Sequence, residues 1–173
     1  MKWQYLSEDI PQSFDEVKSL LAKNRNITDL KDFFTPVHPS EISLEACGLN
    51  AAELQSAHDR LAQAKETGET VVIFGDYDAD GITASAIVWL ALKEYGIVAK
   101  PFIPLRDKHG YGLSVGALEE VIDTHNPSLI VTVDNGIVAH EAADFLASQN
   151  IDLILTDHHQ PEELLPTATA VVH

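Results

Sequence analysis

The sequence predicts an α/β fold: a parallel sheet with helices on both faces, preceded by a short, mostly helical N-terminal segment. From residue 70 onward, short apolar runs alternate with amphipathic stretches, which is the pattern of strand–helix–strand units. Residues 1–45 show helical spacing instead. Acidic motifs directly follow three of the apolar runs, at the strand ends where such sheets bind ligands.

The chain is expected to consist of an appendage, residues 1–45, and a main domain, residues 46–173. In the appendage, Phe14–Leu21 has helical spacing, and a short second element closes at Phe33–Pro36. Asn50 is expected to cap a helix that runs to about Thr67 and ends at Gly68. The strands expected after it are 71–75, 98–103, 129–133, 151–155 and 168–172, and the helices are 82–95, 114–125 and 139–149.

The composition limits the class of function that the chain can have. The 173 residues are 45% hydrophobic, which is enough for a sizeable core, and carry a formal net charge of −16. This charge argues at first against nucleic-acid binding, which normally uses a basic surface. All 11 lysines and arginines lie at or before Lys108, however, so the charge is unevenly distributed, and metal ions would neutralise part of it.

The sequence also favours a soluble, cytoplasmic protein with no membrane association. The lone cysteine, Cys47, cannot form an intramolecular disulfide and fits a reducing compartment. The N-terminus has no apolar core suited to a signal peptide. No apolar run approaches the roughly 20 residues of a membrane span.

The first acidic motif follows the apolar run Val71–Gly75 and contains Asp76, Asp78 and Asp80. Three like charges at the end of one strand repel one another unless a cation holds them together. An EF-hand loop is excluded, because its twelfth position would be Ile87 in place of a glutamate. A solvated acidic turn remains the alternative to a metal site.

Two further motifs follow later strands. Asp134-Asn135-Gly136 places one carboxylate where it could bridge two metals, although Asn-Gly is also a common turn. In Asp157-His158-His159, adjacent histidines on extended backbone would point to opposite sides, so that one ligates metal and the other faces substrate. Asp157 could orient an imidazole, and a polar surface turn is the alternative. Carboxylates with a single imidazole suit Mn²⁺ or Mg²⁺ better than Zn²⁺.

A glycine-containing loop, residues 110–116, is expected beside this site. It resembles a dinucleotide-binding loop but is one residue off, and no strand leads directly into it. Arg106, Lys108 and Tyr111 could offer phosphate and base-stacking contacts there, and a plain surface loop is the alternative.

Together the motifs resemble the DHH phosphoesterase superfamily, and within it the bacterial single-strand-specific 5′→3′ DNA exonucleases. The resemblance covers about residue 45 to the C-terminus. The matching stretches are Gly75-Asp76-Tyr77-Asp78-Ala79-Asp80-Gly81-Ile82-Thr83-Ala84, Ile103-Pro104-Leu105-Arg106 with Gly110-Tyr111-Gly112-Leu113, Val133-Asp134-Asn135-Gly136-Ile137, and Thr156-Asp157-His158-His159.

The resemblance implies two-metal hydrolysis of a phosphodiester with two divalent cations, Mn²⁺ or Mg²⁺. It assigns Asp78 and Asp80 to different metals, with Asp134 bridging them. Asp76 lies near the first metal as a ligand or close neighbour. The remaining assignments are that His158 binds the second metal and His159 contacts the scissile phosphate. Asp157, which could orient an imidazole, is expected beside them as part of the catalytic group.

The resemblance also sets expectations beyond these motifs. Family members carry a further metal-binding aspartate downstream, a DHHA1 domain and, in the exonucleases, an OB-fold, none of which the residues after His159 supply. The expected substrate is single-stranded DNA in repair and recombination, with single-strand-binding protein or a helicase as partners. Alternatives are a hydrolase of short oligonucleotides, cyclic dinucleotides or pyrophosphate, and a non-catalytic scaffold of the same family.

Overall fold

The computed structural model describes residues 10–173, so residues 1–9 of the expected appendage lie outside the described residues. The chain divides into two compact units, Met1–Ser43 and Leu44–His173. The first unit contains helices α1 (Phe14–Lys23) and α2 (Leu30–Phe34) and a 3₁₀ turn, η1 (Pro39–Glu41). Ser13 caps α1 by accepting a hydrogen bond from the Glu16 N–H, which explains why the expected helix begins where it does.

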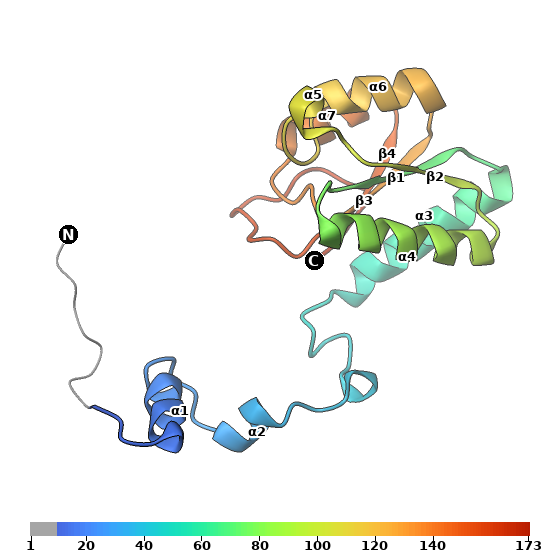
Figure 1. Ribbon diagram of the computed structural model, residues 1–173. Helices are drawn as coiled ribbons and strands as arrows, with labels where there is room; N and C mark the ends of the chain where they lie inside the picture. Colours follow the sequence, from blue (N-terminus) through green and yellow to red (C-terminus); the bar gives the residue numbers. More distant parts are fainter. Residues whose placement is uncertain (1–9) are drawn as a thin grey trace. The chain divides into compact units, whose positions relative to one another are not determined.

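The second unit is built on a five-stranded parallel sheet with the strand order β2-β1-β3-β4-β5 (Figure 1). The pairing is in register along each strand, for example from Val71 opposite Leu129 to Gly75 opposite Val133. The strands are β1 (Val71–Gly75), β2 (Ala99–Phe102), β3 (Leu129–Val133), β4 (Asp152–Thr156) and β5 (Ala170–Val172).

Helices cover both faces of this sheet, which confirms the predicted fold class. Figure 1 shows α3 and α4 on one face and α6 and α7 on the other. The short helix α5 lies in the connection between β2 and α6. The helices of this unit are α3 (Ala51–Thr67), α4 (Ala79–Tyr95), α5 (Arg106–His109), α6 (Val115–His125) and α7 (His140–Ser148).

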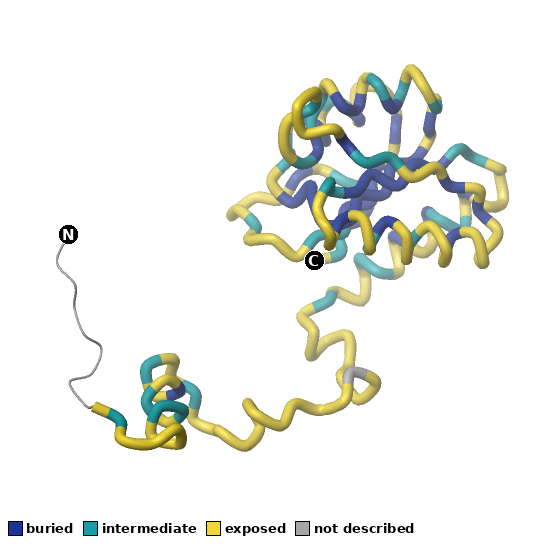
Figure 2. The backbone as a smooth tube through the Cα atoms, in the orientation of Figure 1, coloured by how far each residue is buried: buried dark blue, intermediate teal, exposed yellow. Residues whose placement is uncertain are grey.

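The core consists of two apolar layers separated by the sheet, and Figure 2 shows the buried backbone concentrated there. Val72, Phe74 and Ile130 face α6 and α7, whereas Val71 and Ile73 face α3 and α4. Every residue of β1 and β3 is buried because both faces of these strands are covered. This explains the continuous apolar runs from which the strands were predicted.

Helix α4 begins at Ala79, three residues before the predicted start at residue 82. The reason is that Asp78 caps the helix and accepts hydrogen bonds from the N–H groups of Asp80 and Gly81. Asp80 and Gly81 therefore lie in the first helical turn. The sequence also did not predict α5, and the expected ends of β2, β4 and β5 differ from the observed ends by one or two residues.

A buried arginine joins the amino ends of β1 and β4. Arg60 of α3 is 7% exposed, and its guanidinium donates to Glu69, just before β1, and to Asp152, the first residue of β4. These contacts lie at the amino ends of the strands, opposite the acidic motifs. They therefore stabilise the scaffold without entering the site.

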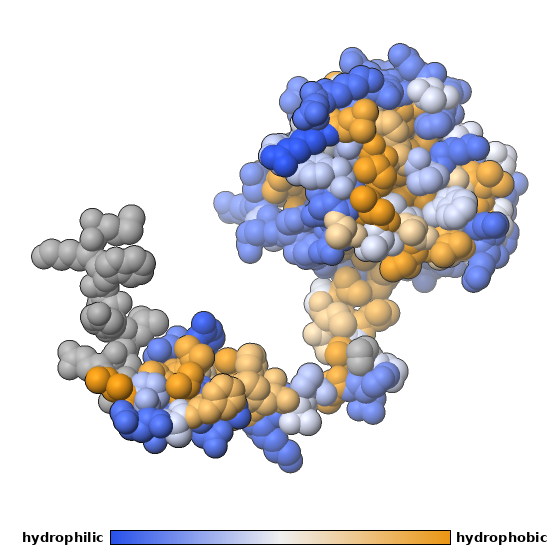
Figure 3. All heavy atoms as spheres, viewed as in Figure 1, coloured by the Kyte–Doolittle hydropathy of each residue, from blue (hydrophilic) through white to orange (hydrophobic). Residues whose placement is uncertain are grey.

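Helix α4 is apolar on its outer side as well as on its inner side. Ile82, Ile87 and Leu90 are each at least half exposed, and apolar side chains reach the surface along this helix in the space-filling view (Figure 3). Among residues 10–173, no helix is long and apolar enough to cross a bilayer.

Candidate metal centre

The three motifs predicted from the sequence meet at one edge of the sheet. Strands β1, β3 and β4 are neighbours in the strand order, and their carboxyl ends open on the same side. Asp76 follows β1, Asp134 follows β3, and Asp157 follows β4. Oxygen atoms from Asp76, Asp78 and Asp134 lie within 4.8 Å of one another.

The backbone holds the first motif in place. The Asp76 carboxylate accepts from the N–H of Tyr77 at 2.7 Å, and Asp78 caps α4. Gly81 makes this geometry possible, because a Cβ added there would lie 2.4 Å from the carbonyl oxygen of Asp76. Only a residue without a side chain allows the first turn of α4 to approach the end of β1 so closely.

Asp134 is the most buried carboxylate of the donor groups and lies at their junction. The residue is 8% exposed and adopts φ 62°, a left-handed conformation that turns the chain sharply after β3. Its Oδ1 lies 2.8 Å from Nε2 of His158. Burial raises the pKa of Asp134 above its ordinary value, and the negative charge of Asp78 raises it further, against the lowering effect of His158. The site therefore holds negative charge that its own cationic groups do not compensate.

Asp157 organises the two histidines. Its side chain is 2% exposed, and Oδ1 accepts from the backbone N–H groups of His158 and His159 and lies 2.7 Å from Nδ1 of His159. The other oxygen accepts from the N–H of Ile137 at 2.9 Å. Burial would raise the pKa of Asp157, but these hydrogen bonds outweigh it and leave the pKa lowered. The hydrogen bond that His159 Nδ1 donates to Asp157 in turn raises the pKa of His159.

The two histidine rings do not point to opposite sides, as extended backbone would require. Their centres lie 4.7 Å apart, and a nitrogen of each lies within 4.8 Å of an Asp134 oxygen. The expectation was wrong because β4 ends at Thr156, and the Asp157 side chain folds the next residues into a turn. Both imidazoles therefore offer a nitrogen to the same donor group around Asp134.

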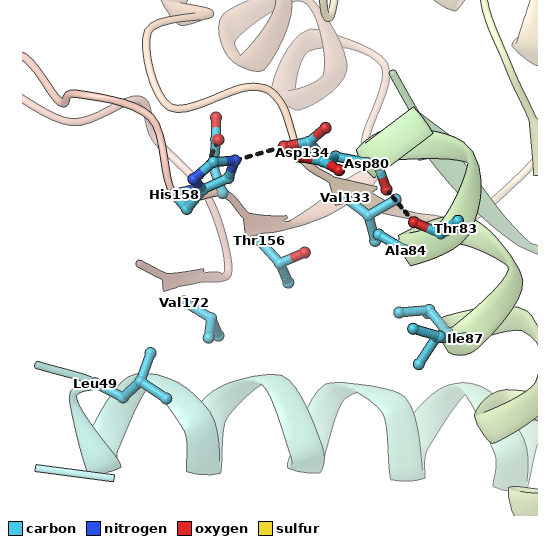
Figure 4. Close-up of a pocket in the computed structure, with 12 residues that line it drawn as sticks. Leu49, Asp80, Thr83, Ala84, Ile87, Val133, Asp134, Thr156, His158 and Val172 are labelled. Atoms are coloured by element: carbon cyan, nitrogen blue, oxygen red, sulfur yellow. Dashed lines mark hydrogen bonds and ion pairs between the residues drawn. The ribbon is translucent and has the colours of Figure 1, made fainter. Parts of the chain in front are cut away.

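A cleft of about 550 Å³ opens beside these groups, and one of its sides is apolar. In Figure 4, Asp134 and His158 lie at one end, while Leu49, Ile87 and Val172 line the opposite part. Asp80 lines this cleft too, but it is not part of either donor group found among the described residues. It reaches the site from the first turn of α4.

Arg106 and Tyr111 lie beside the first motif through their contact with Tyr77. The Arg106 guanidinium carbon lies 4.5 Å from the centre of the Tyr111 ring and 5.6 Å from that of Tyr77. The two tyrosine rings are 6.0 Å apart. Within residues 10–173, Arg106 forms no ion pair with a carboxylate, so no acidic side chain neutralises its charge beside Tyr77. Lys108 is turned away and donates to Glu120.

Sequence reasoning missed Asn135 as more than a turn residue. It is 5% exposed, and its amide nitrogen donates to the carbonyl oxygens of Phe74 in β1 and Val133 in β3. It thereby holds together the two strand ends that carry Asp76 and Asp134. The Asn-Gly pair indicates only a turn, so no sequence signal separates this structural role of Asn135 from that of an ordinary turn residue. The apolar side of the cleft, with Leu49 and Ile87, was also not predicted.

The donor set fits a divalent cation of the oxygen-preferring class. Two donor groups qualify among the described residues: Asp76, Asp78 and Asp134 form one, and Asp134, His158 and His159 form the other. Carboxylate-rich ligation with imidazole suits Mn²⁺ or Mg²⁺. A cation here would also neutralise the charge that raises the pKa of Asp134.

Comparison with known proteins shows the family of the chain. The model of the DHH family, N-terminal domain, matches residues 70–173, which include all three acidic motifs. The chain belongs to the DHH family. The DHH-family match begins just before β1 and ends with the last residue of the chain. It confirms the superfamily resemblance drawn from the motifs.

Curated relatives place the chain near one group of DHH-family proteins. The chain is 38% identical over 120 residues to the single-stranded-DNA-specific exonuclease RecJ of Bacillus subtilis (strain 168), covering 69% of this chain and 15% of that protein. It is also 38% identical over 124 residues to the RecJ of Escherichia coli (strain K12), covering 69% and 21%. The chain thus spans about a fifth or less of the length of these relatives.

Solved structures agree with these matches. A crystal structure of exonuclease RecJ bound to manganese superposes with a TM-score of 0.63 at 35% identity, covering 72% of this chain and 31% of that one. A RecJ from Thermus thermophilus in complex with Mn²⁺ gives a TM-score of 0.59 at 28% identity, covering 91% and 21%. The parallel sheet and its helices are therefore those of a RecJ-type DHH domain.

Proposed function

We propose that this chain carries the catalytic domain of a RecJ-like 5′→3′ exonuclease, a metal-dependent phosphodiesterase that degrades single-stranded DNA. The observation that supports it most is the meeting of Asp76, Asp78, Asp134 and His158 at one edge of the sheet, in a chain 38% identical to RecJ exonucleases. Residues 46–173 are the proposed catalytic domain, and residues 1–45 are the proposed appendage.

The site is proposed to hold two divalent cations, Mn²⁺ or Mg²⁺, with Asp76, Asp78, Asp80, Asp134 and His158 as ligands. The two donor groups share Asp134, which supports a bridging position for this carboxylate. When bound, such cations acidify water at neutral pH and neutralise charge that develops on phosphoryl oxygens.

The chain's own residues have distinct proposed tasks around the reacting phosphate. His159 is proposed to donate a hydrogen bond from Nε2 to a phosphate oxygen. Nε2 is the ring nitrogen available for this contact, because Nδ1 is hydrogen-bonded to Asp157. Asp157 accepts from Nδ1–H and keeps the pKa of His159 raised, which favours the imidazolium, the form in which Nε2 also carries a proton.

Arg106 and Tyr111 are proposed to bind the DNA strand next to the cleaved nucleotide. A guanidinium without an acidic partner suits a phosphate, and the exposed face of Tyr111, 66% exposed, suits stacking with a base. The chain's net charge of −16 makes these few groups the main local attraction for a polyanion besides the cations.

The cellular setting is proposed from the same resemblance. A single-strand-specific exonuclease fits DNA repair and recombination, in the cytoplasm, with single-strand-binding protein or a helicase as partner. The lone cysteine, Cys47, exposed and free in the structure, fits a reducing compartment.

The test compares substrates under matched conditions. The protein, and any longer product of the same gene, are incubated with 5′-phosphorylated single-stranded DNA, short RNA and pyrophosphate, with and without Mn²⁺. The expected result is Mn²⁺-dependent release of mononucleotides from the DNA, lost in Asp80→Ala and His159→Ala. Activity confined to pyrophosphate, or DNA degradation unchanged in Asp80→Ala, contradicts the exonuclease and favours the small-substrate hydrolase. Binding of DNA without hydrolysis favours the scaffold.

A further inference from the structure

The loop that carries Arg106 and Tyr111 is held by a buried histidine that neither the motifs nor the proposed catalysis explain. The side chain of His109, the last residue of α5, is only 3% exposed, although it lies in a surface connection between β2 and α6. A histidine buried in a loop needs partners for both ring nitrogens, because an unsatisfied buried polar group is costly.

Both ring nitrogens of His109 have such partners. Nδ1 accepts a hydrogen bond from the backbone N–H of Leu105 at 3.0 Å. Nε2 lies 2.8 Å from Oε2 of Glu120, in the middle of α6. Because Nδ1 is an acceptor, the proton must reside on Nε2 and point to the glutamate, so this arrangement requires the neutral Nε2–H tautomer.

Further contacts fasten the same residue to the core. The His109 ring lies 5.8 Å from the ring of Phe102, which itself lies 5.3 Å from Phe74 in β1. The His109 carbonyl oxygen accepts from the hydroxyl of Ser114, the N-cap of α6. His109 therefore joins the start of the loop, the sheet and α6 at one point.

Glu120 is a second fastening point for the loop. It accepts from the ammonium of Lys108 as well as from His109. The Lys108 hydrogen bond is the main cause of its lowered pKa, followed by that from His109. The carboxylate is therefore ionised at neutral pH and holds two consecutive loop residues against α6.

The fastened segment presents the proposed DNA-binding side chains. Arg106 and Tyr111 lie on either side of His109 in sequence. Both contact the ring of Tyr77, the residue between Asp76 and Asp78. Two glycines with positive φ, Gly110 and Gly112, give the following turn little stiffness of its own. Its position therefore depends on the residues that anchor it, which are His109 on its amino side and the buried Leu113 on its carboxyl side.

We propose that His109 is a positioning residue for DNA binding: together with Glu120, it latches the loop so that Arg106 and Tyr111 are pre-arranged beside the acidic cluster. This inference rests on the proposed function, since it needs a single strand as the ligand of that loop. Pre-arrangement lowers the entropic cost of ordering the loop on binding, so the latch acts on affinity and leaves the chemical step unchanged.

Four substitutions separate the contributions of His109 and Glu120. His109→Phe keeps the ring against Phe102 and removes both hydrogen bonds. His109→Asn retains an acceptor for the Leu105 N–H, and His109→Gln retains a donor for Glu120. Glu120→Ala removes the carboxylate that pairs with His109 and leaves His109 itself unchanged. His125→Phe, at the far end of α6, is the matched control.

The first readout is hydrogen exchange of the Leu105 amide and of the following loop, which reports the latch independently of catalysis. His109→Phe is expected to speed exchange at Leu105 by about fivefold, the factor for one hydrogen bond of ordinary strength. His109→Asn should restore slow exchange there, and the His125 variant should match wild type. Unchanged hydrogen exchange at Leu105 in His109→Phe would overturn the proposal that His109 holds the loop.

The second readout is steady-state degradation of a 5′-phosphorylated single-stranded oligodeoxynucleotide with Mn²⁺. His109→Phe should raise KM about fivefold, again the factor for one hydrogen bond, with kcat close to wild type. The KM values of His109→Asn and His109→Gln should lie between those of His109→Phe and wild type. A fall in kcat at unchanged KM contradicts a positioning role. Wild-type protein that neither binds nor degrades the oligonucleotide contradicts the proposed function, whereas wild-type turnover with an unaffected phenylalanine variant contradicts the latch alone.

Discussion

Nε2 of His158 lies 2.8 Å from Oδ1 of Asp134, although the two residues are 24 positions apart in the chain. The contact joins the end of β4 to the end of β3 at the junction of both donor groups. It partly offsets the burial and the Asp78 charge that raise the pKa of Asp134. The contact with His158 alone does not neutralise the negative charge of this cluster, and the remaining charge has measurable effects on stability and metal binding.

Replacing Asp134 with Asn should change stability in opposite directions with and without metal. The amide oxygen can still accept from His158, but the charge facing Asp78 is removed. Metal-free protein should therefore be as stable as wild type or more stable, because ionised Asp134 is disfavoured in the fold. Wild type at a hundredfold excess of Mn²⁺ over Kd should gain about 2.7 kcal/mol, and the variant should gain far less.

Thermal unfolding in EDTA and in Mn²⁺ measures both effects. Asp144→Asn, an exposed change on α7, is the control and should leave the Mn²⁺ response intact. DNA degradation by Asp134→Asn should fall by more than about 100-fold, beyond the range for a partner that merely supports a ligand. An Mn²⁺ response equal to that of wild type would exclude Asp134 as a ligand.

Gly81→Ala should destabilise the fold and weaken Mn²⁺ binding together. The new methyl group would lie 2.4–2.6 Å from the backbone of Asp76, so α4 must move away from the end of β1. Overpacking of this kind costs about 1–3 kcal/mol. The free energy of unfolding from urea titration and the Mn²⁺ affinity from calorimetry test the two parts.

Gly116→Ala is the matched control, because this glycine lies in α6 with no atom within 4 Å of an added Cβ. It should stabilise the protein by about 0.5–1 kcal/mol, since alanine loses less backbone freedom in a helix. The two glycine substitutions are thus expected to have opposite signs, and equal effects would contradict the close approach at Gly81.

Asp157→Asn should lower the pKa of His159. The hydrogen bond that His159 donates to Asp157 is the main cause of the raised pKa, and the charges of Asp157, Asp134 and Asp76 add to it. Without that carboxylate the imidazolium loses its proton at lower pH than in wild type. An NMR titration of His159 in EDTA-treated protein measures the shift, with the exposed Asp123→Asn as control.

The same substitution should also destabilise the turn after β4. An asparagine amide group would place a donor against the Ile137 N–H, which now donates to Asp157. Leaving this buried N–H unsatisfied costs about 1–3 kcal/mol. An unchanged His159 pKa in a folded, destabilised variant would show that the carboxylate supports the turn but does not set the protonation of the histidine.

The Arg60–Glu69 contact should make stability fall in acid. Burial alone would raise the pKa of Glu69, but hydrogen bonds from Arg60 and Thr67 outweigh it and leave the pKa below the ordinary 4.5. A depressed pKa means that ionised Glu69 stabilises the fold above pH 4.5 and that this stabilisation disappears as the pH falls through the folded-state value.

Glu69→Gln should therefore be less stable than wild type at neutral pH by about 1 kcal/mol, and the difference should shrink below about pH 4.5. Urea unfolding across this pH range measures it, and Glu66→Gln, an exposed change on the same helix end, should show no such dependence. Mn²⁺ affinity should be unaffected, because Arg60 and Glu69 lie at the amino ends of the strands.

Much of the scaffold was predictable because its signals are local. β1 and β3 were predicted with their observed ends, since strands covered on both faces require unbroken apolar runs. The cap at Asn50 and the end at Gly68 were predicted because capping depends on neighbouring backbone groups. The start of α4 was missed because Asp78 was interpreted only as a ligand, whereas its carboxylate also caps the helix.

Side-chain direction in the site was less predictable. The two adjacent histidines face the same way because Asp157 folds the chain after β4, and Asp157 is itself held by the N–H of Ile137 from another loop. The partnership of His109 with Glu120, and of Asn135 with the Phe74 carbonyl, join segments that share no sequence pattern. Such contacts depend on the packing of whole elements.

The sequence by itself determined the α/β class, the strands and the three acidic strand ends, since periodicity and local hydrogen-bonding chemistry specify them. Only the tertiary structure decided that β3 lies between β1 and β4, and that Asp134 is thereby placed within reach of both Asp78 and His158. The physical reason is that strand order and side-chain direction come from burying both faces of the sheet at once, which no local stretch of sequence encodes.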